Sequence, residues 1–262
     1  MKHQIFRQSV RFIEARLTPG GEFGLHLTVG AVLLVVATAI LHALAQAVMG
    51  QHAITLLDLQ VAQWFHEQAR EPFTAWMRAL SWVHTGVPMV LLVLALAYYF
   101  WRVQARYWLL ALLVATPTGA LLNVALKYTV QRPRPVFDEP LVSLMTYSFP
   151  SGHTAAATVF WGLLASYLVI VRPHWHARLL AICVSVTMVL LVALSRLYLG
   201  AHYLSDVLAA MAESVAWLAI WITAISTLRR RRQAARQASQ QASQPTSQAT
   251  SQHAAQKGVS AG

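Results

Sequence analysis

The sequence predicts an all-α, polytopic membrane protein with six transmembrane helices and with interfacial helices between the first and the second. Of its 262 residues, 57% are hydrophobic and 11% are charged, and the mean hydropathy is +0.50. Soluble domains carry about 25% charged residues, so this composition argues against an ordinary soluble fold. The chain also contains several apolar runs of about 20 residues, the length that a helix needs to cross a bilayer.

Six apolar runs are expected to span the membrane: residues 27–48, 83–101, 107–126, 154–171, 179–199 and 203–228. The third contains Pro117 and Gly119, which predict a kink. So few residues separate the last two runs that we expect a tight helical hairpin. Between the first two runs, apolar residues recur at helical spacing on both sides of Pro72, which predicts short amphipathic helices in the membrane interface. A water-soluble loop is the alternative for that segment.

Three regions are expected along the chain: a cytoplasmic N-terminal segment over 1–26, a six-helix membrane domain over 27–228, and a cytoplasmic tail over 229–262. The tail starts with a basic cluster and continues with Ser, Gln and Ala repeats, which predict disorder. The net charge of +11 could indicate a nucleic-acid partner. Because the basic cluster directly follows the last apolar run, we interpret it as a membrane anchor and expect no nucleic acid. The cluster comprises Arg229, Arg230, Arg231, Arg232 and Arg236.

The distribution of lysine and arginine predicts the orientation, since both are enriched in cytoplasmic segments. With six alternating spans, the N-terminus, the arginine-containing turns at 102–106 and 172–178, and the C-terminal cluster share one side, which we assign to the cytoplasm. The loop after the third span and the turn after the fifth then face outward. Lys127, Arg132 and Arg134 lie on that outer side, an exception to the charge rule that is expected of functional cations.

Most of the conspicuous polar residues fall in or beside those two outward-facing segments, in three groups. The groups are Lys127 with Arg134-Pro135, then Pro150-Ser151-Gly152-His153, then Ser195-Arg196 with His202 and Asp206. Cations, histidines and a carboxylate in an otherwise apolar chain suit one task, which is to hold a phosphate and to transfer it.

His202 and Asp206 are four residues apart at the start of a span, so they lie one turn apart on one helix face. A carboxylate there can accept a hydrogen bond from the imidazole Nδ1, which leaves Nε2 as a nucleophile. An ordinary helix start, with a capping histidine beside an aspartate, is the alternative.

The second group directly precedes an apolar run, and Ser151 or Thr154 can cap that helix. A helix N-terminus beside a glycine such as Gly152 exposes backbone N–H groups that bind anions. His153 would then stand beside a bound phosphate, where it can protonate a leaving oxygen. The alternative is a plain turn.

Lys127, Arg134 and Arg196 supply positive charge, and arginine suits phosphate oxygens because it binds them in a bidentate manner. Anchoring of long basic side chains at the interface is the alternative, and we favour it for Arg132.

Glu213 lies about two turns beyond Asp206 on a similar face. An intramembrane carboxylate is a candidate functional residue, which either supports the site or bonds a neighbouring helix. Asn123 is expected to form a hydrogen bond between helices.

Together the three groups resemble the signature of the type 2 phosphatidic acid phosphatase (PAP2) family. That signature is Lys, six residues, Arg-Pro; then Pro-Ser-Gly-His; then Ser-Arg, five residues, His, three residues, Asp. Every defined position is matched in order by Lys127-Tyr-Thr-Val-Gln-Arg-Pro-Arg134-Pro135, Pro150-Ser-Gly-His153 and Ser195-Arg196-Leu-Tyr-Leu-Gly-Ala-His202-Tyr-Leu-Ser-Asp206, the first, second and third motifs.

The resemblance implies a mechanism in which His202 attacks phosphorus and forms a phosphohistidine, while Asp206 orients His202 and balances its charge. His153 protonates the leaving group and then activates water. The phosphoryl oxygens are held by Lys127, Arg134, Arg196, Ser151 and the N–H of Gly152. Neither a metal nor another cofactor is expected, since protein cations take the role that magnesium has elsewhere.

The resemblance further implies a lipid phosphate or diphosphate substrate. The charge distribution predicts a site at the outer face, and the short segment between the first two motifs indicates a bacterial inner-membrane protein. Candidate substrates are undecaprenyl diphosphate, phosphatidylglycerophosphate, phosphatidate and a lipid A phosphate, with an isoprenoid diphosphate or a broad specificity favoured. Two alternatives remain: a lipid phosphotransferase, in which an alcohol replaces water, and a transporter, which would place polar residues at mid-membrane depth along several helices. The sequence leaves the oligomeric state open.

Overall fold

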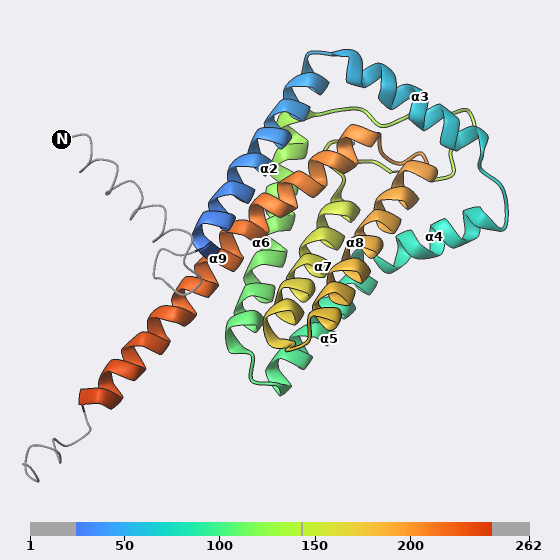
Figure 1. The fold of residues 1–262 in the computed structure, drawn as a ribbon. Coiled ribbons are helices and arrows are strands. Elements are labelled where there is room, and N and C mark those ends of the chain that lie inside the picture. Colours follow the sequence, from blue (N-terminus) through green and yellow to red (C-terminus); the bar gives the residue numbers. More distant parts are fainter. Residues whose placement is uncertain (1–24, 143, 243–262) are drawn as a thin grey trace, which may run out of the picture. The chain divides into compact units, whose positions relative to one another are not determined.

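The computed structural model describes residues 25–142 and 144–242, and these form α-helices joined by turns and loops (Figure 1). The helices are α2 (Leu25–Met49), α3 (Ala53–Glu67), α4 (Phe73–Val83), α5 (Gly86–Arg102), α6 (Arg106–Val130), α7 (Gly152–Val171), α8 (Trp175–Tyr198) and α9 (Leu204–Ala242). The predicted all-α fold is therefore confirmed. The segments 1–24 and 243–262, which hold most of the expected N-terminal segment and much of the tail, lie outside the described residues.

Five of these helices are long and apolar enough to cross a membrane: α2, α6, α7, α8 and α9. The second predicted span, over residues 83–101, corresponds to α5 and the end of α4. Helices α4 and α5 meet at 55° across a short break, and together they pass the same test as one span. At the break, Nε2 of His84 accepts a hydrogen bond from the indole N–H of Trp161 on α7, 3.2 Å away. This side-chain contact ties the bend to the helix that carries the second motif.

The two short helices predicted around Pro72 are present as α3 and α4, and Pro72 directly precedes α4. Both pack against α8. Trp64 and Trp76 keep most of their side chains exposed on the outer surface of these helices. Such apolar exposure suits a lipid environment, whereas their location in the interface stays a prediction.

An apolar core joins α5, α6, α7 and α9. Phe100, Leu112 and Leu163 are fully buried at its centre. Rings from three helices meet there, and Tyr167 on α7 lies edge-on to Phe100 on α5 and to Trp108 on α6, with ring centroids 4.9 and 5.7 Å apart. Edge-to-face packing of this kind adds about 0.5–1.5 kcal/mol per pair beyond the buried area. The core therefore fixes α6 and α7, whose ends carry the first two motifs.

Helix α9 approaches its neighbours closely where they present small residues. A Cβ on Gly119 of α6 would lie 3.2 Å from the ring of Trp217, and a Cβ on Gly162 of α7 would lie 2.5 Å from Leu218. The indole N–H of Trp217 also donates to the carbonyl of Ala115, 3.0 Å away. Gly119 therefore serves helix packing, and α6 continues through both Pro117 and Gly119 to Val130.

Helix α9 continues beyond Arg236 to Ala242, and the rest of the tail, for which disorder was expected, lies outside the described residues. The chain divides at Ile225 into two compact units, and the second, from Ser226 onward, begins with the remainder of α9, which stays helical to Ala242. Arg, Gln and Ala are good helix formers, so a helix that is already formed can propagate through them.

Candidate active site

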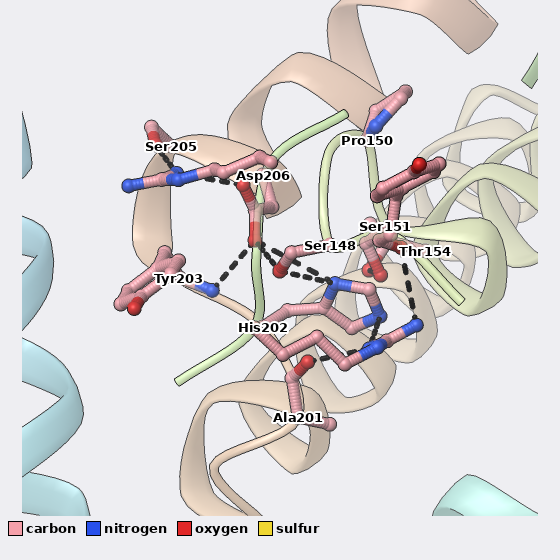
Figure 2. Close-up of polar contacts among 12 residues, drawn as sticks. Ser148, Pro150, Ser151, Thr154, Ala201, His202, Tyr203, Ser205 and Asp206 are labelled. Atoms are coloured by element: carbon pink, nitrogen blue, oxygen red, sulfur yellow. Dashed lines mark hydrogen bonds and ion pairs between the residues drawn. The ribbon is translucent and has the colours of Figure 1, made fainter. Parts of the chain in front are cut away.

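The three motifs converge where α6, α7, α8 and α9 meet their connecting loops. Lys127 is in the last turn of α6, Arg134 is in the loop that follows, and Ser151 is the N-cap of α7. Arg196 is in the last turn of α8, and Asp206 is in the first turn of α9. His202 lies in the predicted short hairpin turn between these two helices. Figure 2 shows residues of the second and third motifs facing one another across the site.

His202 and Asp206 are both buried, and their side chains point toward each other, although the structure modifies the expected direct hydrogen bond. Nδ1 of His202 lies 3.6 Å from Oδ2 of Asp206. The hydroxyl of Ser148 stands between them, as Figure 2 shows; it lies 3.5 Å from Nδ1 and donates to Oδ2. Asp206 also accepts the backbone N–H of Tyr203, at 2.8 Å. These hydrogen bonds hold the carboxylate of Asp206 in place beside the imidazole.

Ser148 was missed by the sequence analysis, because it lies just outside the second motif and a serine carries no signal of its own. Its backbone N–H donates to the carbonyl of Arg132, 2.8 Å away, and its side chain is fully buried. The loop 131–151 is therefore folded back on itself, and this brings the serine hydroxyl to the pair formed by His202 and Asp206.

The other ring nitrogen of His202 faces Arg134. Nη1 of Arg134 lies 3.2 Å from Nε2 of His202 and 2.6 Å from the carbonyl of Ala201. A guanidinium can only donate, so Nε2 accepts and the ring proton of neutral His202 lies on Nδ1. This is the tautomer that leaves a lone pair on Nε2 for attack, and it places a cation beside that lone pair.

The surroundings of His202 keep its ring neutral. Burial lowers the pKa of His202 to about 4; Asp206 opposes this shift, and the positive charges of Arg134 and Arg196 add to it. Burial also lowers the pKa of Arg134, and the charge of Asp206 partly offsets that effect. At neutral pH the site therefore holds an unprotonated imidazole beside a charged guanidinium.

Lys127, expected to bind phosphate, points at the backbone that precedes α7. Its ammonium donates to the carbonyls of Tyr147, 2.8 Å away, and Pro150, 2.7 Å away. These bonds hold the second motif against the end of α6. These contacts support a role for Lys127 in shaping the anion site, and its ammonium group still adds positive charge to that site.

Arg196 is buried and retains a free donor. Nη1 donates to the hydroxyl of Ser81 on α4. Nε has no hydrogen-bond partner among the described residues. A buried unpaired donor on a cation is costly unless a ligand completes it. Arg196 is therefore the phosphate-binding candidate whose hydrogen bonding is left incomplete.

Gly152 and His153 open onto a cavity of about 440 Å³ between α5, α6, α7 and α9. Along α6 the lining runs from Thr116 to Lys127, about 16 Å at the rise of a helix. Apart from the groups near the motifs, the lining is mostly apolar, with Met89, Val90, Val93, Ala120, Val124, Ala156, Val159 and Trp217. His153 thus stands between the polar site and an apolar chamber.

Ser151 occupies the predicted N-cap position, but its side chain makes no capping hydrogen bond. Its hydroxyl instead accepts from the hydroxyl of Thr154, 3.1 Å away, and its backbone N–H donates to the carbonyl of Asp206, 3.1 Å away. The start of α7 is therefore tied directly to the third motif, and Figure 2 shows the two segments facing each other.

The interfacial role favoured for Arg132 is wrong. The side chain is buried and forms ion pairs of 2.7 Å with both Asp58 and Asp206. Its guanidinium also lies 4.0 Å from the ring centroid of Tyr203. Burial alone would lower the pKa of Arg132, but the two carboxylates raise it. Asp58 is distant from Arg132 in sequence, so the spacing of residues does not identify it as the partner.

Glu213 takes part in an interhelical hydrogen bond, in which it accepts from the side-chain amide of Asn123 at 2.9 Å. This confirms the expected interhelical role of Asn123. Both residues line the cavity beside Lys127 and His153. Among the described residues, no three His, Cys, Asp or Glu side chains gather as a set of metal ligands.

Comparison with known proteins points to one family. The family model of the PAP2 superfamily matches residues 107–231. Phosphatidylglycerophosphatase B of Bacillus subtilis (strain 168) is 41% identical over 101 residues, which are 38% of this chain and 49% of that protein. The aligned part of the chain thus spans about half the length of this relative.

Solved structures share the arrangement of helices. The crystal structure of a transmembrane PAP2 type phosphatidylglycerolphosphate phosphatase from Bacillus subtilis matches with a TM-score of 0.67 at 24% identity, over 72% of this chain and 93% of that chain. The crystal structure of Aquifex aeolicus LpxE matches with a TM-score of 0.51 at 19% identity, over 63% of this chain and 94% of that one. At these identities the likeness concerns the fold, that of a multi-pass membrane protein. The family match covers the parts of α6, α7, α8 and α9 that carry all three motifs, so residues 107–231 resemble the PAP2 superfamily.

Proposed function

We propose that the chain is a lipid phosphate phosphatase that works through a phosphohistidine on His202 without a metal. The proposal rests on one observation, which is that polar side chains contact both ring nitrogens of His202. Arg134 donates to Nε2, and Ser148 and Asp206 face Nδ1. A histidine held in this tautomer, beside a cation that can receive a phosphoryl oxygen, is prepared for nucleophilic attack.

In the first step Nε2 of His202 attacks phosphorus, the N–P bond forms, and the bond to the lipid oxygen breaks. His153 gives its proton to that leaving oxygen. The phosphoimidazole carries positive charge, which Asp206 offsets from the Nδ1 side. General acid catalysis of this kind contributes about 10²- to 10⁴-fold in rate.

In the second step His153, now neutral, takes a proton from water as the water attacks phosphorus. The N–P bond breaks, and phosphate leaves with His202 restored. Arg134, Arg196, Lys127 and the N–H of Gly152 supply positive charge to the phosphoryl oxygens in both steps. The unpaired Nε of Arg196 supports this assignment, because a phosphoryl oxygen would complete its hydrogen bonding.

For the substrate we propose a phospholipid monoester of the phosphatidylglycerophosphate class. The names of the Bacillus relative and of the Bacillus crystal structure support this choice over an isoprenoid diphosphate. The apolar cavity beside His153 provides the second support. Its length along α6 suits part of an acyl chain, while the phosphate lies at the charged end.

The proposal is tested with purified protein and His202→Ala. The wild type should release inorganic phosphate from phosphatidylglycerophosphate, including in EDTA, and His202→Ala should lose this activity while its thermal unfolding stays unchanged. The exposed His174 gives a matched control, because His174→Ala should keep full activity. Activity retained in His202→Ala, or lost in EDTA and restored by magnesium, would contradict the mechanism.

Two further measurements refine the test. An acid-labile, base-stable phosphate on the wild type, absent from His202→Ala, would identify the phosphohistidine. Adding an alcohol acceptor separates the hydrolase from a phosphotransferase, since the latter would transfer phosphate to the alcohol in preference to water.

A further inference from the structure

We infer that Asp58, on α3, is a positioning residue of this site, and that it acts through Arg132 on Asp206, the carboxylate that faces His202. The inference rests on the proposed function and adds a residue that lies outside all three motifs, on a helix that contributes none of them.

The burial of Asp58 is the first observation. Helix α3 is largely exposed, and its buried residues are Asp58 and Ala62. A fully buried carboxylate on such a helix needs compensation, because burial of an unpaired ion costs several kcal/mol. Packing alone would select an apolar residue at this position. The carboxylate therefore has a purpose that an apolar side chain would not serve.

The partners of Asp58 are the second observation: Ser205 at the start of α9 and Arg132 in the loop after α6. Oδ1 accepts the backbone N–H of Ser205, 2.9 Å away, and Oδ2 accepts the hydroxyl of the same serine. Oδ2 also accepts Nη2 of Arg132, at 2.7 Å. Asp58 thus holds both the residue before Asp206 and the cation paired with Asp206.

The geometry of Arg132 is the third observation. Its Nη2 is directed to Asp58, and its Nη1 donates to Asp206 and to the hydroxyl of Ser205, each at 2.7 Å. One guanidinium is therefore shared between two carboxylates. Without Asp58, Arg132 would pair with Asp206 alone. Its guanidinium could then rotate so that it binds that carboxylate in a bidentate manner.

The consequence concerns His202. Asp206 must keep enough negative charge, in the correct place, to orient the ring through Nδ1 and to offset the charge of the phosphoimidazole. By sharing Arg132, Asp58 preserves that charge and fixes the carboxylate. Its loss should slow the chemical steps and leave substrate binding nearly unchanged, since Asp58 does not line the cavity.

Asp58→Asn tests the inference, because the amide keeps the shape and removes the charge. We expect kcat to fall about tenfold or more, the size of one lost hydrogen bond to a charged group, with KM within about twofold. Glu67→Gln is the matched control on α3, an exposed carboxylate that pairs with Gln63, and it should keep the wild-type kcat.

A double-mutant cycle identifies the route. If Asp58 acts through Arg132, Asp58→Asn should change kcat by less than about twofold in an Arg132→Gln background. Multiplicative effects of the two changes, or a wild-type kcat in Asp58→Asn, would overturn the inference even if the wild type is a phosphatase.

A readout independent of turnover is the ¹⁵N spectrum of the His202 ring, assigned by its loss in His202→Gln. We expect a single Nδ1-protonated tautomer in the wild type and a mixed or shifted signal in Asp58→Asn. Unchanged ring signals would refute the inference whatever the substrate. If Asp58→Asn does not fold, Asp58→Glu displaces the carboxylate while keeping its charge, and the same shift is expected there.

Discussion

At the scale of single residues, Ser148 is the side chain through which Asp206 reaches His202. Its hydroxyl donates to the carboxylate and lies 3.5 Å from Nδ1. The carboxylate oxygen is 3.6 Å from the same ring nitrogen, so the serine hydroxyl and the carboxylate both face Nδ1. The serine is thus part of the unit that orients the nucleophile.

Ser148→Ala should therefore lower kcat by about 10- to 100-fold, since a hydrogen bond to a charged group contributes about 1.5–3 kcal/mol. The measurement is phosphate release at saturating substrate. Ser166→Ala is the control, because the hydroxyl of Ser166 bonds within α7, to the carbonyl of Gly162. Equal activity of the two variants would show that Asp206 acts on His202 without the serine.

The buried imidazole of His202 predicts a pH dependence of stability. Its pKa is lowered to about 4 in the fold, between Arg134 at Nε2 and Asp206 at Nδ1, whereas an unfolded histidine has a pKa of about 6.5. Between these two values the unfolded chain binds more protons than the fold, so stability falls as pH is lowered through the window.

Thermal unfolding of the wild type and of His202→Gln should show this difference. As pH decreases from about 7 to about 5, across the ordinary pKa of histidine, the midpoint of the wild type should fall more steeply than that of the variant, which lacks the titrating group. Parallel curves would mean that the ring is protonated at its ordinary pKa in the folded protein.

At the scale of elements, the turn from α8 to α9 depends on Gly200. Its φ is +65°, and a Cβ there would lie 2.7 Å from Cε2 of Phe137 in the loop 131–151. The turn must be this tight because His202 follows within two residues and faces that same loop. Both the backbone conformation and the close approach therefore exclude a side chain.

Gly200→Ala should be destabilising and should lower activity, because strain of about 1–2 kcal/mol from the left-handed backbone adds to the collision with Phe137. Gly86→Ala separates the two contributions, since Gly86 also has a positive φ, +32°, but a Cβ added there would meet nothing within 4 Å. The thermal unfolding midpoint of Gly200→Ala should be lower than that of Gly86→Ala. Combining Phe137→Leu with Gly200→Ala should restore part of the difference in midpoint. Equal losses would assign the cost to the backbone alone.

Some of the helices could be predicted closely from the sequence, whereas the break between α4 and α5 could not. The apolar run 107–126 predicted α6 closely, because periodic burial and length are local properties. The break at His84 was not predicted, and the residue that His84 contacts there, Trp161, lies far along the chain. The same holds within the site. Motif spacing found His202 and Asp206, whereas the pairing of Arg132 with Asp58 joins segments that no local pattern connects.

One local signal of that pairing was nevertheless present. Asp58 is an acidic residue inside the otherwise uncharged run from Ile54 to Phe65. A charge in such a run needs a partner, and Arg132 is a basic residue outside the defined positions of the family motifs. These two charges of opposite sign suggest an ion pair, although not its link to Asp206.

At the scale of the whole molecule, six alternating crossings would separate the loop 131–151 from the turn between α7 and α8 by the full thickness of the bilayer. Lysine and arginine counts predict that the first lies outside and the second in the cytoplasm. An outward-facing site would act on phosphate groups in the outer leaflet, so the orientation decides which lipid pool the enzyme can reach.

Cysteine labelling tests this orientation, because the chain has a single cysteine, Cys183. Two variants with a single cysteine are made in a Cys183→Ser background, Glu139→Cys in the loop and His174→Cys in the turn. Both positions are exposed, and they are predicted to lie on opposite sides of the membrane. A membrane-impermeant maleimide applied to cells with a permeabilised outer envelope should label position 139 at once and position 174 only after the inner membrane is opened. Labelling in the reverse order would place the site in the cytoplasm, and it would limit the proposed activity to lipid phosphates of the inner leaflet.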